Sequence, residues 1–177
     1  MRRNVSCIAF SAALLCIAVP GRAAPVTPAP AAPRLIPAEA PAIRKAVESA
    51  GGAAVLVNIW ATWCVPCREE FGDVLKVRRD LAERGLKVIL VSADFDDARD
   101  DAVRFLGERG VDFPSYVKVG RDEDFIAALA PEWSGVLPAT LIYDGHGRLV
   151  KILEGQQTYE TFRDWSIQAI EKGRNAK

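Results

Sequence analysis

The chain has 177 residues, of which 50% are hydrophobic, which is enough for one folded domain with short appendages. Its 23 basic and 23 acidic residues balance, so the charge gives no support for a nucleic-acid partner. Cys7 and Cys16 lie close to the N-terminus, whereas Cys64 and Cys67 lie in the body of the sequence. Any cysteine chemistry of the folded domain therefore falls on the pair Cys64 and Cys67.

The first 23 residues have the organisation of an export signal. Arg2 and Arg3 precede an apolar run over residues 5–19, and the small residues around Ala23 offer a cleavage site. The run is shorter than the roughly 20 apolar residues of a membrane-spanning helix. We therefore expect residues 1–23 to be a cleaved signal peptide and the protein to be periplasmic or otherwise exported. The alternative is an uncleaved signal that keeps the chain associated with the membrane.

Residues 24–37 are rich in proline and alanine. Proline fixes the backbone and removes a hydrogen-bond donor, so this segment is expected to be an extended, poorly packed linker. The patterns of secondary structure begin after it, and we expect the folded domain to span residues 38–177.

Helical and strand patterns alternate through this domain. In chain order we expect a helix over residues 38–52, a buried strand over 53–60, a helix from residue 64 or 65 to 84, a strand over 86–94, helices over 97–110 and 123–130, a hairpin over 139–155 and a closing helix over 158–173. The first connections are long enough for right-handed crossovers, whereas the turn DGHG is typical of a hairpin. These features predict an α/β fold with helices on both faces of a mixed central sheet, in which parallel strands are followed by a C-terminal antiparallel hairpin.

A structural staple and a metal site are two poorly fitting interpretations of Cys64 and Cys67. A disulfide across so short a loop restricts the unfolded chain very little. A structural zinc site needs four ligands, and the single histidine, His146, lies in a turn where we expect it to be solvated. Among metal-binding roles, transient copper binding is the one that the sequence excludes least.

The context of the cysteine pair favours redox chemistry. Cys64 stands where a strand ends and a helix begins, and the partial positive charge of a helix N-terminus stabilises a thiolate. Cys67 lies one turn further along and is expected to be more buried, so it would act on a bond formed by Cys64. Pro66 is compatible with the first helical turn. Trp63 would cover the nucleophile, although without the cysteines it would be read as an ordinary, partly buried aromatic residue.

The stretch NIWATWCVPCREE (residues 58–70) resembles the thioredoxin-like superfamily, and more specifically the exported TlpA/ResA/CcmG group of thiol-disulfide oxidoreductases. VILVSAD (88–94) and LPATLIYDGHGRLV (137–150) follow in the order that this group uses. The resemblance covers about residues 38–172. It implies a thioredoxin-like fold and protein-disulfide reductase activity.

The resemblance also implies roles for individual residues. Cys64 would be the attacking thiol, Cys67 the resolving thiol, and Pro138 a cis-proline that faces them; X–Pro is the bond at which the cis form is accessible. Asn58 occupies the strand position where thioredoxins bury an acid. Glu70, three residues after Cys67, matches an acid of the group. It either tunes or deprotonates a thiol, or is a solvated acid in the first helical turn.

The partners that the resemblance implies are protein disulfide substrates, such as those of cytochrome c or copper-site maturation, and a membrane electron donor of the DsbD/CcdA type. The reaction needs no cofactor and no metal. Leu137, where some relatives carry Thr or Val, leaves the direction of electron flow open. The alternatives are a thiol oxidase or isomerase, a peroxidase of related fold, and a non-catalytic thioredoxin-like module that binds metal or protein.

Overall fold

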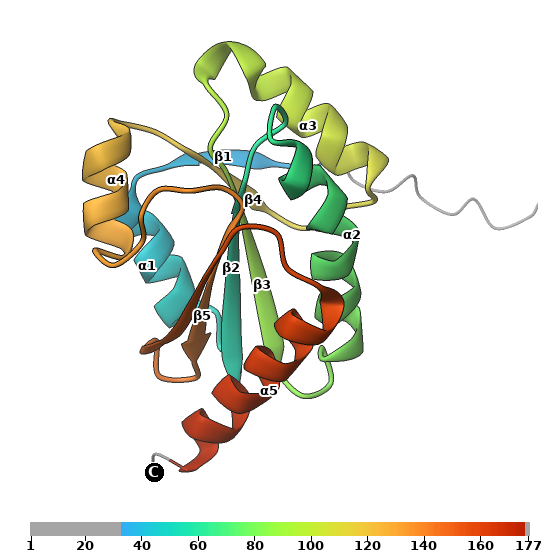
Figure 1. Cartoon of the computed structure of the whole chain (residues 1–177), viewed down its shortest axis with the longest axis vertical. Coiled ribbons are helices and arrows are strands. Elements are labelled where there is room, and N and C mark those ends of the chain that lie inside the picture. The colour runs from blue at the N-terminus through green and yellow to red at the C-terminus, as the bar shows by residue number, and fades with distance from the viewer. Residues whose placement is uncertain (1–32, 176–177) are drawn as a thin grey trace, which may run out of the picture.

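A six-stranded mixed sheet forms the centre of the protein in the computed structural model, which describes residues 33–175 (Figure 1). The elements in chain order are β1 (Leu35–Ala38), α1 (Ala40–Ser49), β2 (Ala54–Trp60), α2 (Val65–Asp80), β3 (Leu86–Ser92), a 3-10 turn (Asp96–Ala98), α3 (Arg99–Glu108), β4 (Ser115–Lys118), α4 (Asp122–Leu129), β5 (Ala139–Asp144), β6 (Leu149–Glu154) and α5 (Tyr159–Asn175). The predicted signal peptide and most of the predicted linker lie outside the described residues. Within them, no helix is both long and apolar enough to cross a membrane.

The strand order is β1-β4-β3-β2-β5-β6. The pairs β1–β4, β4–β3 and β3–β2 are parallel, whereas β5 runs antiparallel to both β2 and β6. The predicted mixed sheet with a C-terminal antiparallel hairpin is therefore confirmed. Strand β2 lies in the middle, with a parallel neighbour on one side and an antiparallel neighbour on the other.

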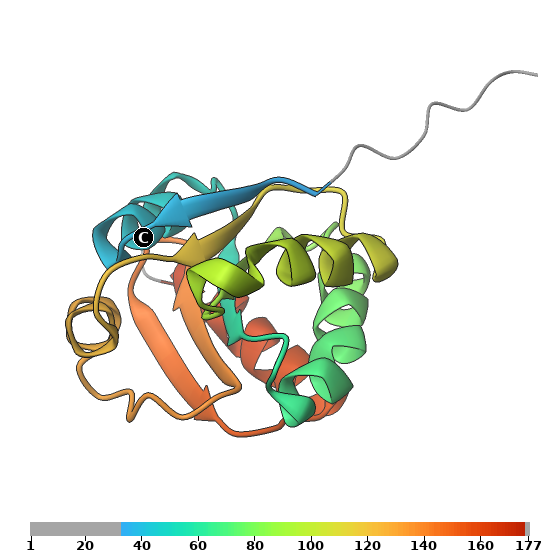
Figure 2. The ribbon, with the colours of Figure 1, turned by 90° about the horizontal axis from the view of Figure 1, so that it is seen from above.

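Helices cover both faces of the sheet, as predicted. The buried side chains of α2, α3 and α5 belong to one hydrophobic cluster, and those of α1 and α4 belong to a second cluster on the opposite face (Figure 2). All seven residues of β2 are buried because the strand has a helical layer on each side. This accounts for its unbroken apolar run in place of an alternating pattern.

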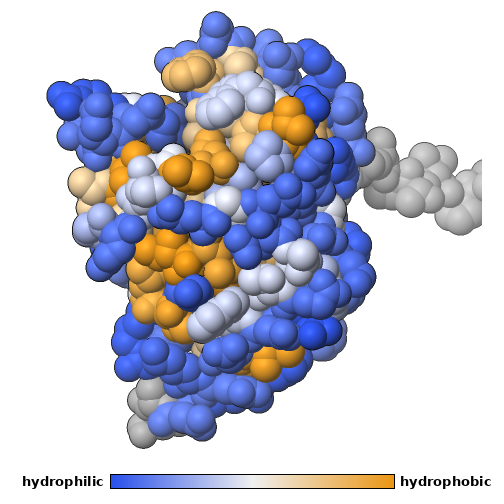
Figure 3. Space-filling view, viewed as in Figure 1, coloured by the Kyte–Doolittle hydropathy of each residue, from blue (hydrophilic) through white to orange (hydrophobic). Residues whose placement is uncertain are grey.

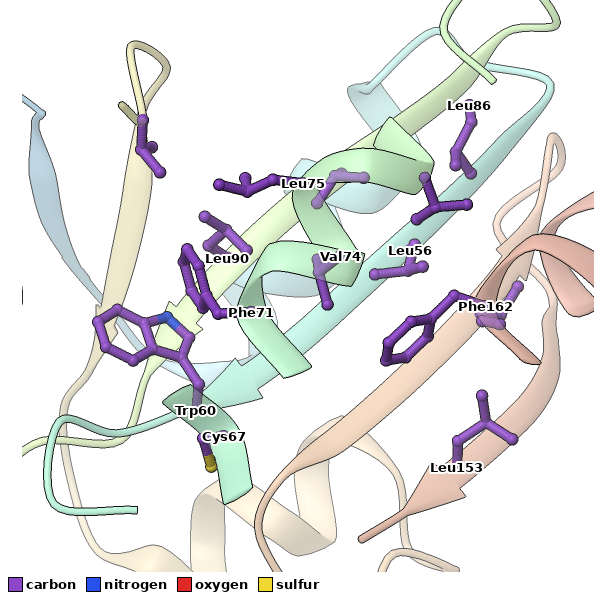
Figure 4. Packing of buried hydrophobic residues seen from close by; sticks show 14 of the residues in the cluster. Leu56, Trp60, Cys67, Phe71, Val74, Leu75, Leu86, Leu90, Leu153 and Phe162 are labelled. Carbon is purple, nitrogen blue, oxygen red and sulfur yellow. The ribbon is translucent and has the colours of Figure 1, made fainter. Parts of the chain in front are cut away.

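The larger cluster lies between α2 and the sheet (Figure 4). Phe71 and Val74 of α2 are fully buried there, and their spacing of three residues puts them on one face of the helix. The ring of Trp60 at the end of β2 lies 5.1 Å from that of Phe71 and 4.9 Å from that of Phe105, measured between ring centroids. Cys67 belongs to the same cluster as this aromatic group, so the cysteine pair is attached to a closely packed part of the core.

Two strands were not predicted, β1 and β4. The first overlaps the segment expected to be a linker, so the boundary at residue 37 is wrong: Leu35, Ile36 and Pro37 pair with β4. Proline is compatible with this position because β1 is an edge strand, where one side of the backbone needs no partner. Both strands have four residues, too few for a recognisable pattern.

Two glycines provide a test of the backbone geometry. Gly85, after α2, has a φ of +90°, and a Cβ atom added to it would lie 3.0 Å from the Cβ of Ala53. Gly85→Ala is therefore expected to lower the free energy of unfolding by about 1–2 kcal/mol. Gly72 is the control, since it is helical and exposed and a Cβ there would meet nothing within 4 Å. Gly72→Ala should raise stability by about 0.5–1 kcal/mol in urea unfolding, and equal changes in both variants would contradict the argument.

Candidate active site

Cys64 and Cys67 form a disulfide at the N-terminus of α2, with an S–S distance of 2.04 Å and Cα atoms 5.3 Å apart. Cys64 is the N-cap residue, and its sulfur accepts a hydrogen bond from the backbone N–H of Cys67 at 3.3 Å. The same N–H can stabilise a Cys64 thiolate when the disulfide is open. Cys64 keeps 5% of its surface exposed and Cys67 keeps 1%, so an incoming thiol or disulfide reaches Cys64 first.

The proline segment lies beside the cysteine segment. The Leu137–Pro138 peptide bond is cis, in agreement with the implied geometry. Pro138 directly precedes β5, and the first residue of that strand, Ala139, pairs with Ile59 near the end of β2. Because Cys64 follows the same end of β2, the register brings Pro138 and the disulfide to one edge of the sheet. Pro66 lies in the first turn of α2, as predicted.

Glu70, about one turn after Cys67 on α2, is buried and holds segments distant in the sequence together. One carboxylate oxygen accepts a hydrogen bond from the side-chain amide of Asn58 at 3.1 Å, and the other accepts one from the backbone N–H of Gln157 at 2.8 Å. The amide of Asn58 also donates to the Thr140 hydroxyl at 3.0 Å. Glu70 is only 2% exposed, so the alternative of a solvated first-turn acid is wrong.

Burial raises the pKa of Glu70 to about 7, even though the hydrogen bonds from Gln157 and Asn58 favour the charged form. A carboxyl group with this pKa exchanges its proton near neutral pH. Glu70 also lies three residues after Cys67, which places the two on the same side of α2. The buried acid of this site therefore comes from helix α2. The strand position at which thioredoxins carry an acid is occupied by Asn58, whose amide binds Glu70.

Asp94, two residues after β3, is a buried carboxylate that the sequence analysis did not single out. It accepts hydrogen bonds from the backbone N–H of Thr62 at 2.9 and 3.1 Å and from the Thr62 hydroxyl at 2.6 Å. The Ser92 hydroxyl donates to it at 2.7 Å. These bonds fix the segment that leads into Cys64. The sequence feature that could have identified Asp94 is its position, because it is an acid at the carboxyl end of the strand next to β2.

Large hydrophobic side chains surround this edge of the sheet. Those that are more than half exposed there are Trp63, Val65, Phe95 and Val136, and we call these four the apolar rim. Figure 3 shows separate hydrophobic areas near the start of α2 and over the segment between α4 and β5, on a face that is otherwise largely hydrophilic. Trp63 thus extends outward beside Cys64 and is more exposed than a partly buried core residue. Exposed apolar groups of this size indicate a surface that contacts another molecule.

A groove of about 270 Å³ adjoins the apolar rim. Its main apolar walls are formed by Trp63, Phe95, Phe125, Ile126, Trp133 and Leu137. Lys118 and Asp122, which form an ion pair, lie in the same groove. The groove therefore lies between Trp63, the residue before Cys64, and Leu137, the residue before the cis-proline.

His146 lies at the opposite end of the sheet from the cysteines. It follows β5, whose last residue, Asp144, pairs with Ala54 at the start of β2. Its side chain is exposed and its Nε2 atom lies 3.1 Å from the Gly173 carbonyl oxygen. The expected solvated turn residue is confirmed, and a metal ligated jointly by His146 and the cysteines is incompatible with this placement.

Comparison with known proteins supports the relationship that the motifs indicated. The thiol:disulfide interchange protein CycY of Rhizobium leguminosarum bv. viciae is 32% identical over 123 residues, which are 68% of this chain and 60% of that protein. The thiol-disulfide oxidoreductase ResA of Bacillus thuringiensis (strain Al Hakam) is 31% identical over 110 residues, 62% of this chain and 59% of that protein. The chain thus spans about three-fifths of the length of these curated relatives.

The fold is also similar to that of a solved thiol:disulfide interchange protein. The crystal structure of a thiol:disulfide interchange protein of the thioredoxin family from Chlorobium tepidum TLS matches with a TM-score of 0.58 and 25% identity, over 69% of this chain and 83% of that one. The predicted thioredoxin-like fold is confirmed. Residues 29–164, well over half of the sequence, match the family model Redoxin, and the chain therefore belongs to the Redoxin family.

Proposed function

We propose that the protein is an exported thiol-disulfide oxidoreductase that reduces disulfides of other exported proteins through Cys64 and Cys67. The observation that carries this proposal is the Cys64–Cys67 disulfide at a helix N-terminus, where the more exposed sulfur is bordered by the apolar rim. A disulfide that only stabilised the fold would need neither an adjoining groove nor a nearby buried acid.

The reaction begins with the pair in its dithiol state. The Cys64 thiolate attacks one sulfur of a substrate disulfide, and the other substrate sulfur leaves as a thiolate that takes up a proton. The Cys67 thiolate then attacks the Cys64 sulfur in the mixed disulfide and releases the second substrate sulfur. Two electrons pass to the substrate, and Cys64 and Cys67 are left joined by a disulfide.

Glu70 is proposed to take the proton from the Cys67 thiol before the second attack. A buried thiol resists ionisation, and a carboxyl group with a pKa of about 7 is matched to this transfer near neutral pH. Asn58 and Gln157 keep the carboxyl group in place through their hydrogen bonds. Pro138 is proposed to align the substrate chain beside the pair, because it belongs to the segment that faces the cysteines.

An exported reductase works in an oxidising compartment and must be reduced again after each cycle. We propose that a membrane electron donor of the DsbD/CcdA type returns the two electrons by the same exchange chemistry. The export signal expected over residues 1–23 is consistent with this location. Substrates in the maturation of cytochrome c or of copper-site proteins are proposed on the same basis.

The reduction potential of the pair is the direct test of the direction of electron flow. It is measured by equilibration with dithiothreitol or glutathione in a Cys7→Ser/Cys16→Ser chain, in which Cys64 and Cys67 are the remaining thiols. We expect a potential well below about −200 mV, near the value of thioredoxin. A potential near about −120 mV would make the protein an oxidant. A pair that never cycles would favour the non-catalytic binding module.

A further inference from the structure

One wall of the groove beside the disulfide is a loop without regular secondary structure, residues 130–138 between α4 and β5. Trp133, Gly135 and Leu137 of this loop line the groove. The loop is close to α4, since a Cβ atom added to Gly135 would lie 2.8 Å from Cδ1 of Ile126. The shape of the groove therefore depends on what holds this loop in position.

Glu154, the exposed last residue of β6, makes two short hydrogen bonds to the loop. Its carboxylate accepts a hydrogen bond from the backbone N–H of Ser134 at 2.7 Å and another from the Ser134 hydroxyl at 2.6 Å. These short bonds to an ionised acceptor are of the strong kind. They lower the pKa of Glu154, so the carboxylate is charged at neutral pH. The Ser134 hydroxyl also accepts the Val136 N–H at 3.4 Å, which continues the connection towards the proline.

The residues that follow Glu154 connect the loop to the buried acid. The N–H of Gly155 donates to the Pro138 carbonyl at 2.9 Å, and the Gln157 side-chain amide donates to the Glu154 and Gly155 carbonyls at 3.2 and 3.0 Å. The backbone of Gln157 holds Glu70. The connection from Glu154 to Gln157 thus supports the groove wall at one end and the carboxyl group of Glu70 at the other.

We propose that Glu154 is a positioning residue that holds this wall in the form that accepts a large apolar side chain next to the substrate cysteine. The inference rests on the proposed function for the identity of the substrate. A groove of about 270 Å³ is large enough for such a side chain, since a cavity of about 150 Å³ already binds benzene. The walls are mainly apolar, and they include Trp63, the residue before Cys64, and Leu137, the residue before the cis-proline.

The experiment measures binding separately from catalysis. Two peptides differ in a single residue, Leu or Gly, next to a Ser that replaces the substrate cysteine, and their binding to the full chain is followed by tryptophan fluorescence. The original chain is expected to bind the Leu peptide roughly tenfold more tightly, as burial of one aliphatic side chain predicts. Glu154→Ala should weaken binding of the Leu peptide roughly fivefold and leave the Gly peptide nearly unchanged.

Two further variants separate positioning from a general effect of charge. Glu154→Gln keeps an oxygen for the Ser134 N–H and an amide that can donate to the hydroxyl, so it should retain most of the preference for Leu. Glu132→Ala removes an exposed carboxylate of the same loop that has no hydrogen bond or ion pair to another described residue, and it should change nothing.

Equal affinity for the two peptides in the original chain would overturn the inference, and so would an unchanged preference in Glu154→Ala. Reduction of the matching disulfide peptides is assayed in parallel. Loss of that activity with the Leu preference intact would refute the proposed function while leaving the positioning role of Glu154 in place.

Discussion

A Cys64→Ser variant is expected to reduce substrate disulfides no faster than the uncatalysed exchange, because the attacking sulfur is absent. The serine hydroxyl cannot replace it, since it is far weaker as an acid and does not form the mixed disulfide. The fold should be retained, because serine is nearly the same size and can still accept the Cys67 N–H as an N-cap. Reduction of a disulfide peptide, in the Cys7→Ser/Cys16→Ser chain, is the measurement.

The matched variant is Cys67→Ser, which removes the second attack and leaves the first. We expect it to accumulate a mixed disulfide between Cys64 and the substrate, visible by mass spectrometry as a covalent adduct that dithiothreitol releases. Turnover by Cys64→Ser, or an adduct located on Cys67, would contradict the assigned order of the two thiols. The difference in exposure between the two cysteines is the structural basis of that order.

Replacement of Glu70 by Gln is expected to alter how stability depends on pH. The pKa of Glu70 in the folded protein, about 7, lies above its ordinary value of 4.5 because of burial. The neutral carboxyl group therefore makes its full contribution to the free energy of unfolding below pH 4.5. This contribution is lost as the pH rises through about 7. Between pH 5 and pH 8 the original chain should lose about 2–3 kcal/mol relative to Glu70→Gln.

Urea unfolding of both proteins at several pH values gives this difference directly, and Glu69→Gln is the control because Glu69 is the exposed neighbour. The reductase rate provides a second readout. The original chain should show a titration near pH 7 in the step that Cys67 performs, and Glu70→Gln should lack it and be slower by about 10²-fold. Parallel pH profiles for the two proteins would rule out proton transfer by Glu70.

The long elements were predictable from the sequence, whereas the short outer strands were not. The run over β2 and the apolar spacing along α2 report burial directly, because each residue there faces a packed layer. Strand β1 is held by pairing with β4, and β4 is held between β1 and β3. The paired residues of β1 and β4 lie about eighty residues apart in the sequence, so no local pattern encodes this pairing.

The same distinction holds at the site. The cysteines are recognisable because the strand, the turn and the helix that position them are contiguous. The burial of Glu70 depends on Asn58, twelve residues earlier, and on a backbone N–H 87 residues later. Helical spacing places Glu70 beside Cys67 but does not indicate which side faces solvent. Asp94 acts across a gap of 32 residues on Thr62, and its role follows only from the alignment of adjacent strands.

The edge strand β1 also bears on the solubility of the protein. An open edge offers unpaired backbone groups to which another chain can add a strand, which is a common start of aggregation. Here the edge is four residues long, and Pro37 interrupts its donors. These features discourage growth of the sheet from one molecule to the next at the β1 edge. Two molecules that approach each other at the β1 edge would therefore meet through exposed side chains, and their backbones would not pair there.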